Sequence, residues 1–472
     1  MIRKMKNKKT VLLRVFVLFG VALLLQSCFV AKTYERPEVL DEAHFRTDQI
    51  ARDSIGLGDL SWRELFRDEQ LANHIERALE NNMDIRVALQ QIAIADAYYK
   101  QGKVGYFPTL NARGQVTHQE LSANSQFGSL FDGSITQYEL TATMAWEADV
   151  WGKIRSTKRA SGAAYLQTAA AHQVVKTQLI AQVATVYYQL MMLDAQLELV
   201  EETINNRTNS LETTIALKDA GLVTEVAVKQ TEAQLLTAKL LKVDIERNIA
   251  LAENMFSILL GEVPQAVNRG KLEEQSLPEE LETGYPAMLL GNRPDVMAAE
   301  FRLMEAFELT NVARSQFYPS LAISATSGFQ SLEADMLLNP NSIFATFVGS
   351  LTQPIFNGRR IRTEYEASKS RQEIALLQFR QALLTASREV SDALYSYNAA
   401  VEKIDIKNRE FEAYSLAVEY SEELLNHGMA NYLEVLTAKE STLNAGVQLT
   451  VMKYEKLQAV VELYRALGGG RE

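Results

Sequence analysis

The most regular feature of the chain is a ladder of apolar and aromatic side chains that recurs every seven residues. The ladder lies in a stretch from 359 to 426 that holds no glycine and no proline, and its members are Leu376, Leu383, Val390, Tyr397, Ile404, Phe411, Val418 and Leu425. A seven-residue period kept for this long is typical of helices that pack as a coiled coil. At 1.5 Å per residue the stretch predicts a helix of roughly 100 Å, longer than a compact domain of this size.

The chain carries this design twice. "GLVTEVAVKQTEAQLLTA" begins at Gly221 and "GMANYLEVLTAKESTLNA" begins at Gly428, 207 residues later. Moving the ladder back by 207 residues places apolar side chains at Val183, Leu190, Leu197, Ile204 and Leu211. Upstream, "GYFPTL" and "QFYPSL" pair at an offset of 211, so a loop absorbs the difference. We therefore expect two repeats, each with a long helix and two shorter ones, at about 83–107 and 224–260 in the first copy.

Between the helices the period changes from seven to two. Leu110, Ala112, Gly114 and Val116 alternate with polar residues, and a second alternating run covers 137–147. Runs of about ten alternating residues have the length of a tilted strand that crosses a bilayer. A half-buried hairpin of a soluble sheet would show the same alternation. Two matched hairpins in so helical a chain favour the membrane, where four strands cannot close a barrel alone and several copies must contribute.

The N-terminal sequence has the pattern of an export signal. Six Lys/Arg within residues 1–27 precede or flank an apolar run at 15–25, which is too short to span a bilayer. "LQSC" follows and resembles a bacterial lipobox, so we expect cleavage before Cys28 and a lipid, such as palmitate, on its thiol. An ordinary signal with a chance cysteine is the alternative. As the only cysteine, Cys28 excludes an internal disulfide.

The net charge and the sequence motifs argue against two other classes of protein, nucleic-acid-binding proteins and enzymes. Without residues 1–27 the chain has 42 basic and 59 acidic residues, a net charge of −17, which makes nucleic acid a poor partner. This charge fits a solvated acidic surface or a cation-favouring pore. The five histidines lack metal-ligand spacing, and neither a nucleophile elbow nor a phosphate loop occurs. We expect no enzyme, no cofactor and no metal.

Several short motifs, in their order, resemble the TolC family of outer-membrane efflux proteins, in the lipoprotein branch (NodT/OprM type) that serves resistance-nodulation-division pumps. They are "TYERP" at 33–37, "WRELFRDEQL", "ALENNMDI", "NRPDV" at 292–296, "FYPSL" at 317–321 and "PIFNGRR" at 354–360. The resemblance implies a homotrimer with a twelve-stranded barrel in the outer membrane and a helical tunnel in the periplasm. It also implies a passive exit duct that works with a periplasmic adaptor and an inner-membrane pump. A lipid-anchored structural coiled coil without a pore is the competing class.

With this resemblance the predicted organisation is mainly α with membrane β strands. It consists of a signal peptide at 1–27, a lipidated linker at 28–60, a first repeat at 61–263, an equatorial linker at 264–290 and a second repeat at 291–472. The hairpins are expected at about 109–147 and about 320–353.

The resemblance also assigns candidate site residues. Two helix-ending glycines place the periplasmic tips, which would meet the adaptor, at Gly221, Leu222, Val223, Gly428 and Met429. The segment after the second tip would narrow the tunnel, with candidate constriction residues Leu433, Glu434, Thr437, Ala227 and Gln230. Thr437 stands where many members carry Asp. Glu434 is otherwise an exposed helical carboxylate, and the polar latch of some members has no obvious partners here.

Overall fold

The fold was analysed in a computed structural model that describes residues 30–37, 61–122, 124, 133–275 and 293–470. The chain forms two compact units, and each takes segments from both sequence repeats. One unit contains the strands, with residues up to 37, 93–167 and 299–378; the other contains 38–92, 168–298 and 379–472. The long helices contribute to both, and each unit is described by itself.

The repeat offsets predicted from the sequence are confirmed helix by helix. Helix α5 (Lys153–Asp219) matches α9 (Arg360–Asn426), and α6 (Glu225–Leu259) matches α10 (Tyr432–Ala466), all shifted by 207 residues. Helix α4 (Met83–Val104) matches α8 (Pro294–Ser315), shifted by 211. Two short helices, α2 (Trp62–Leu65) and α3 (Glu69–Asn81), precede α4. Every member of the seven-residue ladder is buried or half-buried, as coiled-coil packing requires.

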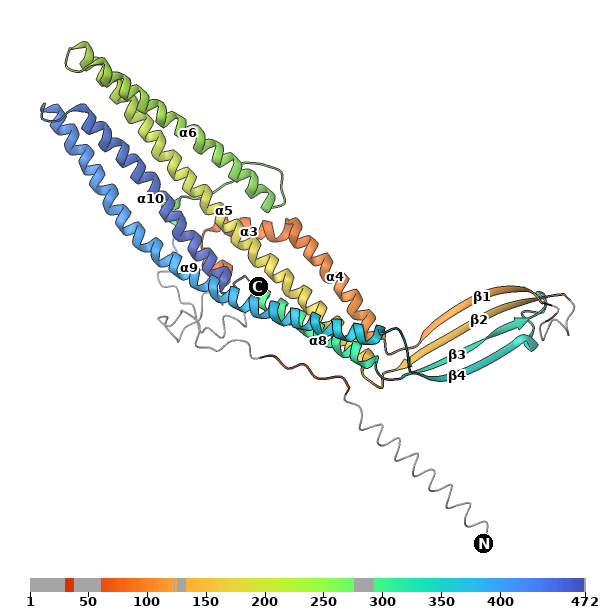
Figure 1. The fold of residues 1–472 in the computed structure, drawn as a ribbon. Helices are drawn as coiled ribbons and strands as arrows, with labels where there is room; N and C mark the ends of the chain where they lie inside the picture. The colour runs from red at the N-terminus through yellow and green to blue at the C-terminus, as the bar shows by residue number, and fades with distance from the viewer. Residues whose placement is uncertain (1–29, 38–60, 123, 125–132, 276–292, 471–472) are drawn as a thin grey trace, which may run out of the picture. The chain divides into compact units, whose positions relative to one another are not determined.

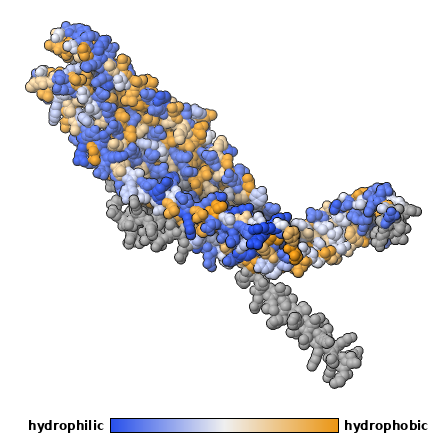
Figure 2. Space-filling model, viewed as in Figure 1, coloured by the Kyte–Doolittle hydropathy of each residue, from blue (hydrophilic) through white to orange (hydrophobic). Residues whose placement is uncertain are grey.

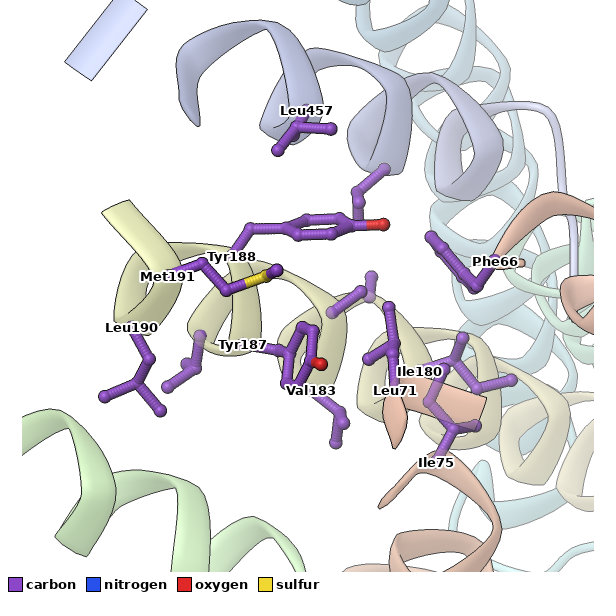
Figure 3. Close-up of a cluster of buried hydrophobic side chains, with 14 of the residues drawn as sticks. Phe66, Leu71, Ile75, Ile180, Val183, Tyr187, Tyr188, Leu190, Met191 and Leu457 are labelled. Carbon is purple, nitrogen blue, oxygen red and sulfur yellow. The ribbon is translucent and has the colours of Figure 1, made fainter. Parts of the chain in front are cut away.

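The helical unit is held together by a cluster of large buried side chains. Tyr187 and Tyr188 of α5 are 0 % and 2 % exposed, and they pack among residues of α3 and α10 (Figure 3). The Tyr187 hydroxyl donates to Asp68 at 2.9 Å and accepts the Gly270 amide at 3.1 Å. Burial, the main cause, raises the pKa of Tyr187 above its usual range. The second bond fixes Gly270, part of the predicted equatorial linker, against α5.

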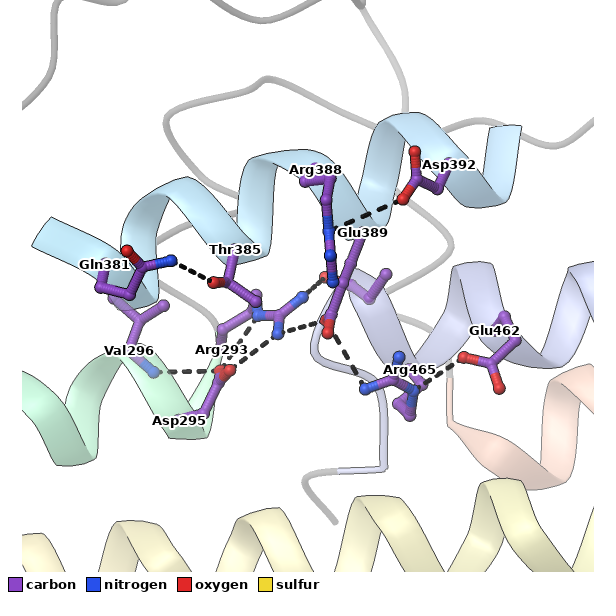
Figure 4. Close-up of polar contacts among 11 residues, drawn as sticks. Arg293, Asp295, Val296, Gln381, Thr385, Arg388, Glu389, Asp392, Glu462 and Arg465 are labelled. Carbon is purple, nitrogen blue, oxygen red and sulfur yellow. Dashed lines mark hydrogen bonds and ion pairs between the residues drawn. The ribbon is translucent and has the colours of Figure 1, made fainter. Parts of the chain in front are cut away.

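A buried arginine joins three helices of this unit near the start of the second repeat. Arg293, from the "NRPDV" motif, is 4 % exposed and donates to the Ala466 carbonyl at 2.9 Å (Figure 4). Its guanidinium also pairs with Asp295 and with Glu389 of α9, each at 2.7 Å. Burial alone would lower the pKa of Arg293, but the two carboxylates outweigh it and raise that pKa. Removing both carboxylates would leave the buried guanidinium without an opposite charge.

The strand-containing unit has one antiparallel sheet. Its strands are β1 (Thr109–Glu120), β2 (Ser134–Ala148), β3 (Ser320–Ser331) and β4 (Ile343–Thr352), in the order β1-β2-β3-β4 (Figure 1). This confirms both predicted hairpins, and β2 pairs directly with β3, which joins the two repeats.

The register sorts the sheet into apolar and polar rows. One row crosses all four strands as Leu110, Met144, Ala325 and Phe347, and the next as Asn111, Thr143, Thr326 and Thr346. Two hydroxyls in the polar row, on Thr143 and Thr326, lie 3.1 Å apart. Because side chains alternate between faces, one face carries the apolar row and the other the polar row, as predicted, although Phe344 and Val348 of β4 lie on the polar face. Within the described ranges, no helix is long and apolar enough to cross a membrane.

Acid should weaken the fold through His74 of α3. His74 is 7 % exposed, its Nε2 hydrogen-bonds the Asn268 carbonyl at 2.9 Å, and its Nδ1 has no partner. Burial, the main cause, lowers the pKa of His74 below the 6.5 expected when unfolded. The neutral ring therefore stabilises the fold fully above about pH 6.5, and this contribution is lost as the pH falls through the lower folded-state pKa. We expect the Tm of purified protein to drop between pH 7.5 and 5.

His74→Gln keeps a donor near Asn268 but cannot take up a proton in this range. The variant should have a lower Tm at neutral pH and a smaller drop on acidification, measured by circular dichroism. His427→Gln, at an exposed position, serves as the control and should follow the parent. A His74→Gln variant with the full parental acid sensitivity would contradict this assignment.

Candidate functional site

The two helical hairpins of the helical unit end in matching tips. After α5, the Gly221 amide donates to the Lys218 carbonyl and the Leu222 amide to the Leu217 carbonyl, both at 2.9 Å. The same two bonds follow α9 at Gly428 and Met429, at 3.0 and 2.8 Å. Gly221 and Gly428 have φ of 76° and 70°, which side chains disfavour. Leu222 and Met429 are 71 % and 70 % exposed, whereas Val223 is half-buried.

The first two turns of α10 carry three of the predicted constriction residues. The Asn431 side chain caps the helix: its Oδ1 accepts the Glu434 amide at 3.1 Å and its Nδ2 donates to Glu434 Oε1 at 3.0 Å. A carboxylate in a first helical turn is favoured by the helix dipole. Leu433 is 58 % exposed, and Thr437 is exposed with its hydroxyl bonded to the Leu433 carbonyl at 2.9 Å. Glu434 therefore has a local capping role as well as an accessible carboxylate.

The equivalent first two turns of α6 carry the other two predicted constriction residues, Ala227 and Gln230. Gln230 is exposed and Ala227 is half-buried, and the capping residue Thr224 makes no side-chain bond to its helix. Lys218 at the end of α5 lies 3.4 Å from Glu225 at the start of α6, an ion pair across the tip. The first-copy turn is thus held by an exposed ion pair, where the second-copy turn is held by a cap.

A polar contact between the two hairpins was missed by the sequence analysis. The Tyr432 hydroxyl lies 3.1 Å from Thr214 Oγ1 on α5 and 2.8 Å from Thr231 Oγ1 on α6. Two turns further along α10, Lys439 Nζ donates to Ser210 Oγ of α5 at 3.1 Å. The expectation that a polar latch lacks partners here is wrong. The contact is made by hydroxyl groups. A Thr or Tyr at a single helical position gives no sequence signal.

A cleft of about 530 Å³ lies next to this contact, between α5, α9 and α10. Arg207 lines it, is only 5 % exposed, and donates from Nη1 to the Gln234 carbonyl of α6 at 2.5 Å. Burial, the main cause, lowers the pKa of Arg207, and nearby Glu440 opposes this. Lys439, which is paired with Glu422 at 2.7 Å, also lines the cleft. Tyr432 and Lys439 therefore join the hairpins by polar contacts beside this cleft.

Comparison with known proteins shows which family has this architecture. A family model described as outer membrane efflux protein matches residues 74–262 and 285–469. The chain belongs to the outer membrane efflux protein family. The two matched stretches correspond to the two repeats, so the match rests on the whole double architecture.

Individual relatives of this efflux protein cover nearly its full length. It is 30 % identical over 463 residues to the cation efflux system protein CusC of Escherichia coli, with 96 % of this chain and 98 % of that one covered. It is 28 % identical over 455 residues to the solvent efflux pump outer membrane protein SrpC of Pseudomonas putida, covering 95 % and 96 %. The crystal structure of the open state of the MtrE outer membrane channel of Neisseria gonorrhoeae superposes with a TM-score of 0.84 at 25 % identity, covering 94 % and 98 %.

These relatives support the predicted outer-membrane efflux channel and not the alternative of a coiled coil without a pore. The roles of the tip and constriction residues remain predictions. Cys28, the signal at 1–27 and part of each predicted linker lie outside the described residues. In the part of the chain that is described, no three His, Cys, Asp or Glu side chains are grouped as metal ligands.

Removing the Tyr432 hydroxyl should loosen the contact between the hairpins. In Tyr432→Phe the two threonine hydroxyls keep their bonds to the Ser210 and Ala227 carbonyls, so the cost in stability should stay near 1 kcal/mol. We expect resting conductance in planar bilayers to rise several-fold, because the start of α10 is no longer tied to α5 and α6. Tyr420→Phe, at an exposed tyrosine of α9, is the matched control. Equal conductance of both variants and the parent would rule the contact out as a closing element.

Glu434 should favour cations in the closed channel. If copies surround one axis, its carboxylate appears several times at one depth, where like charges attract cations. Glu434→Gln keeps an acceptor for Asn431 and removes only the charge, so it should lower cation selectivity without loosening the cap. Small substitutions at both Leu433 and Glu434 should raise conductance. Glu410→Ala, which removes a carboxylate paired with Lys407 on α9, should do neither. Parental selectivity in Glu434→Gln would leave Glu434 as a capping residue only.

Proposed function

We propose that three copies of this chain form the exit duct of a tripartite efflux system, which carries substrate passively from an inner-membrane pump through a periplasmic adaptor to the outside. The observation that carries the proposal is the open sheet of four membrane-length strands. A single chain leaves β1 and β4 each paired on one side only. In lipid such edges leave backbone groups without partners, so β1 of one copy must pair with β4 of the next. Three copies give the twelve strands that the family resemblance implies.

The two faces of the sheet support closure around a water-filled pore. The apolar row through Leu110, Met144 and Phe347 suits lipid, and the polar row through Thr143 and Thr326 suits a lumen. Apolar side chains gather at the foot of the sheet (Figure 2), where Phe107, Ile355 and Phe356 are 69 %, 94 % and 92 % exposed. Aromatic girdles of this kind mark the interfaces of membrane barrels.

The pump and the adaptor are inferred from relatives and from the tips. The relatives CusC and SrpC are a cation efflux system protein and a solvent efflux pump outer membrane protein, and both names describe parts of larger systems. Leu222 and Met429, exposed at two helix ends of matching geometry, offer apolar contacts to an adaptor. Lipidation of Cys28 would add an anchor in the outer membrane, in keeping with the lipobox-like "LQSC".

Bulky substitutions at the tips should separate docking from channel formation. Gly221→Trp and Gly428→Trp force side chains onto positive φ with open space around them, so each tip changes shape while the helices behind it remain. We expect efflux in cells to be abolished, while purified variants still form trimers that conduct in planar bilayers. Gly114→Ala, on β1 with equally open surroundings, is the control and should retain efflux.

Two results would count against the proposal in different ways. Parental efflux in the tip variants would show that the tips do not dock a partner. A purified parent that is not trimeric, or that gives no conductance, would show that the sheet does not close as proposed.

A further inference from the structure

The cleft of about 530 Å³ between α5, α9 and α10 changes in polarity along its length. Its lining residues nearer the tips are polar, namely Ser210, Glu422 and Lys439. Those farther from the tips are apolar, namely Leu199, Phe411 and Leu443. The apolar end packs around Gly446 of α10, where an added Cβ would lie 2.8 Å from Leu199 and 3.1 Å from Phe411. The cleft therefore has an apolar part and a polar part, as sites for small amphipathic molecules do.

Arg207 lies between these two ends and is buried without an acidic partner. Its side chain is only 5 % exposed, and Nη1 donates to the neutral Gln234 carbonyl at 2.5 Å. Among the residues that the structure describes, its Nε has no hydrogen-bond partner and no Asp or Glu lies within ion-pair distance of it. A carbonyl satisfies one N–H group but does not compensate the charge. A buried charge that lacks an opposite charge is costly.

The chain treats two comparable arginines differently. The side chains of Arg269 and Arg293 are 11 % and 4 % exposed, and each pairs with two carboxylates. Burial acts to lower the pKa of all three guanidinium groups, but the carboxylates outweigh it at Arg269 and Arg293 and raise their pKa. At Arg207 burial prevails and the pKa is lowered, with only the exposed Glu440 opposing it. The chain itself therefore supplies no close counter-charge to Arg207.

The other charges of the cleft leave Arg207 as the group that would select a ligand. Lys439 is already neutralised by Glu422 at 2.7 Å. Glu202 also lines the cleft, but it is exposed, so water and salt screen its repulsion of an anion. A guanidinium offers a planar set of donors that matches a carboxylate, and the hydrogen bonds are strengthened by both charges.

We propose that this cleft binds a small amphipathic carboxylate, whose charged group pairs with Arg207 and whose apolar body lies against Leu199 and Phe411. A volume of about 530 Å³ is in the range of small-molecule sites. The acid could come from membrane lipid, as a fatty acid, or from the periplasm, as an aromatic acid. The site lies within one chain, so it does not depend on the ring of the proposed function.

Isothermal titration of the purified full-length protein with a matched pair of ligands tests the proposal. The pair is 2-naphthoate and 2-naphthamide, which share a body and differ in charge. Arg207→Gln keeps a donor near the Gln234 carbonyl and removes the charge. Arg247→Gln, at an exposed arginine of α6, is the matched control. Ser415→Phe adds a ring to the α9 wall of the cleft and leaves Arg207 untouched.

We expect the parent and Arg247→Gln to bind the acid at least tenfold more tightly than the amide. Arg207→Gln should lose this preference, and Ser415→Phe should weaken binding of the acid at least tenfold. Circular dichroism shows whether each variant is folded, and if Arg207→Gln is not, the ligand pair on the parent and Ser415→Phe still decide. Equal affinity of the parent for acid and amide, no binding of the acid, or parental binding in Ser415→Phe would each overturn the proposal.

A parallel titration with decanoate distinguishes the two sources. Binding of either acid that Arg207→Gln abolishes supports the site, and the tighter ligand shows whether the occupant is a fatty acid or an aromatic acid. Oligomeric state is measured separately on the same samples. A protein that binds the acid but is not trimeric would contradict the proposed duct and leave this site supported.

Discussion

The structure depends on one constraint, which is that every backbone amide and carbonyl removed from water must find a partner. In the sheet, β2 and β3 have partner strands on both sides, whereas β1 and β4 each have one outer edge without a partner strand in the same chain. A chain with such a sheet is complete only as part of a ring. The strands come from two distant parts of the sequence, so the internal repeat is what places four strands side by side in each copy.

The same constraint shapes the helical unit. All four long-hairpin helices end with the same pair of main-chain bonds at a glycine, which are Gly221, Gly261, Gly428 and Gly468. These ends satisfy the last carbonyls and stop each helix sharply. Between them, the seven-residue ladders bury apolar side chains, and Tyr187 and Arg293 connect the helices to the linker and to the start of the second repeat.

The two repeats share a backbone but differ in the side chains at the starts of α6 and α10. Asn431 caps its helix and Tyr432 bridges to the other hairpin, whereas their first-copy counterparts, Thr224 and Glu225, make neither contact. The asymmetry puts the polar link between hairpins at one end of one helix.

The sequence by itself determined the repeat, the long helices and the two hairpins, because each depends on periodicity or on glycine and proline punctuation within a short window. It located both tips for the same reason, since the glycine at a helix end is a local requirement. Only the tertiary structure decided that β2 pairs with β3, that Tyr432 meets Thr214 and Thr231, and that Asn311 holds the main chain of Lys32. These contacts join residues separated by 173 (Ala148 and Leu321) to 279 positions, and single hydroxyls or amides at such distances leave no period in the sequence.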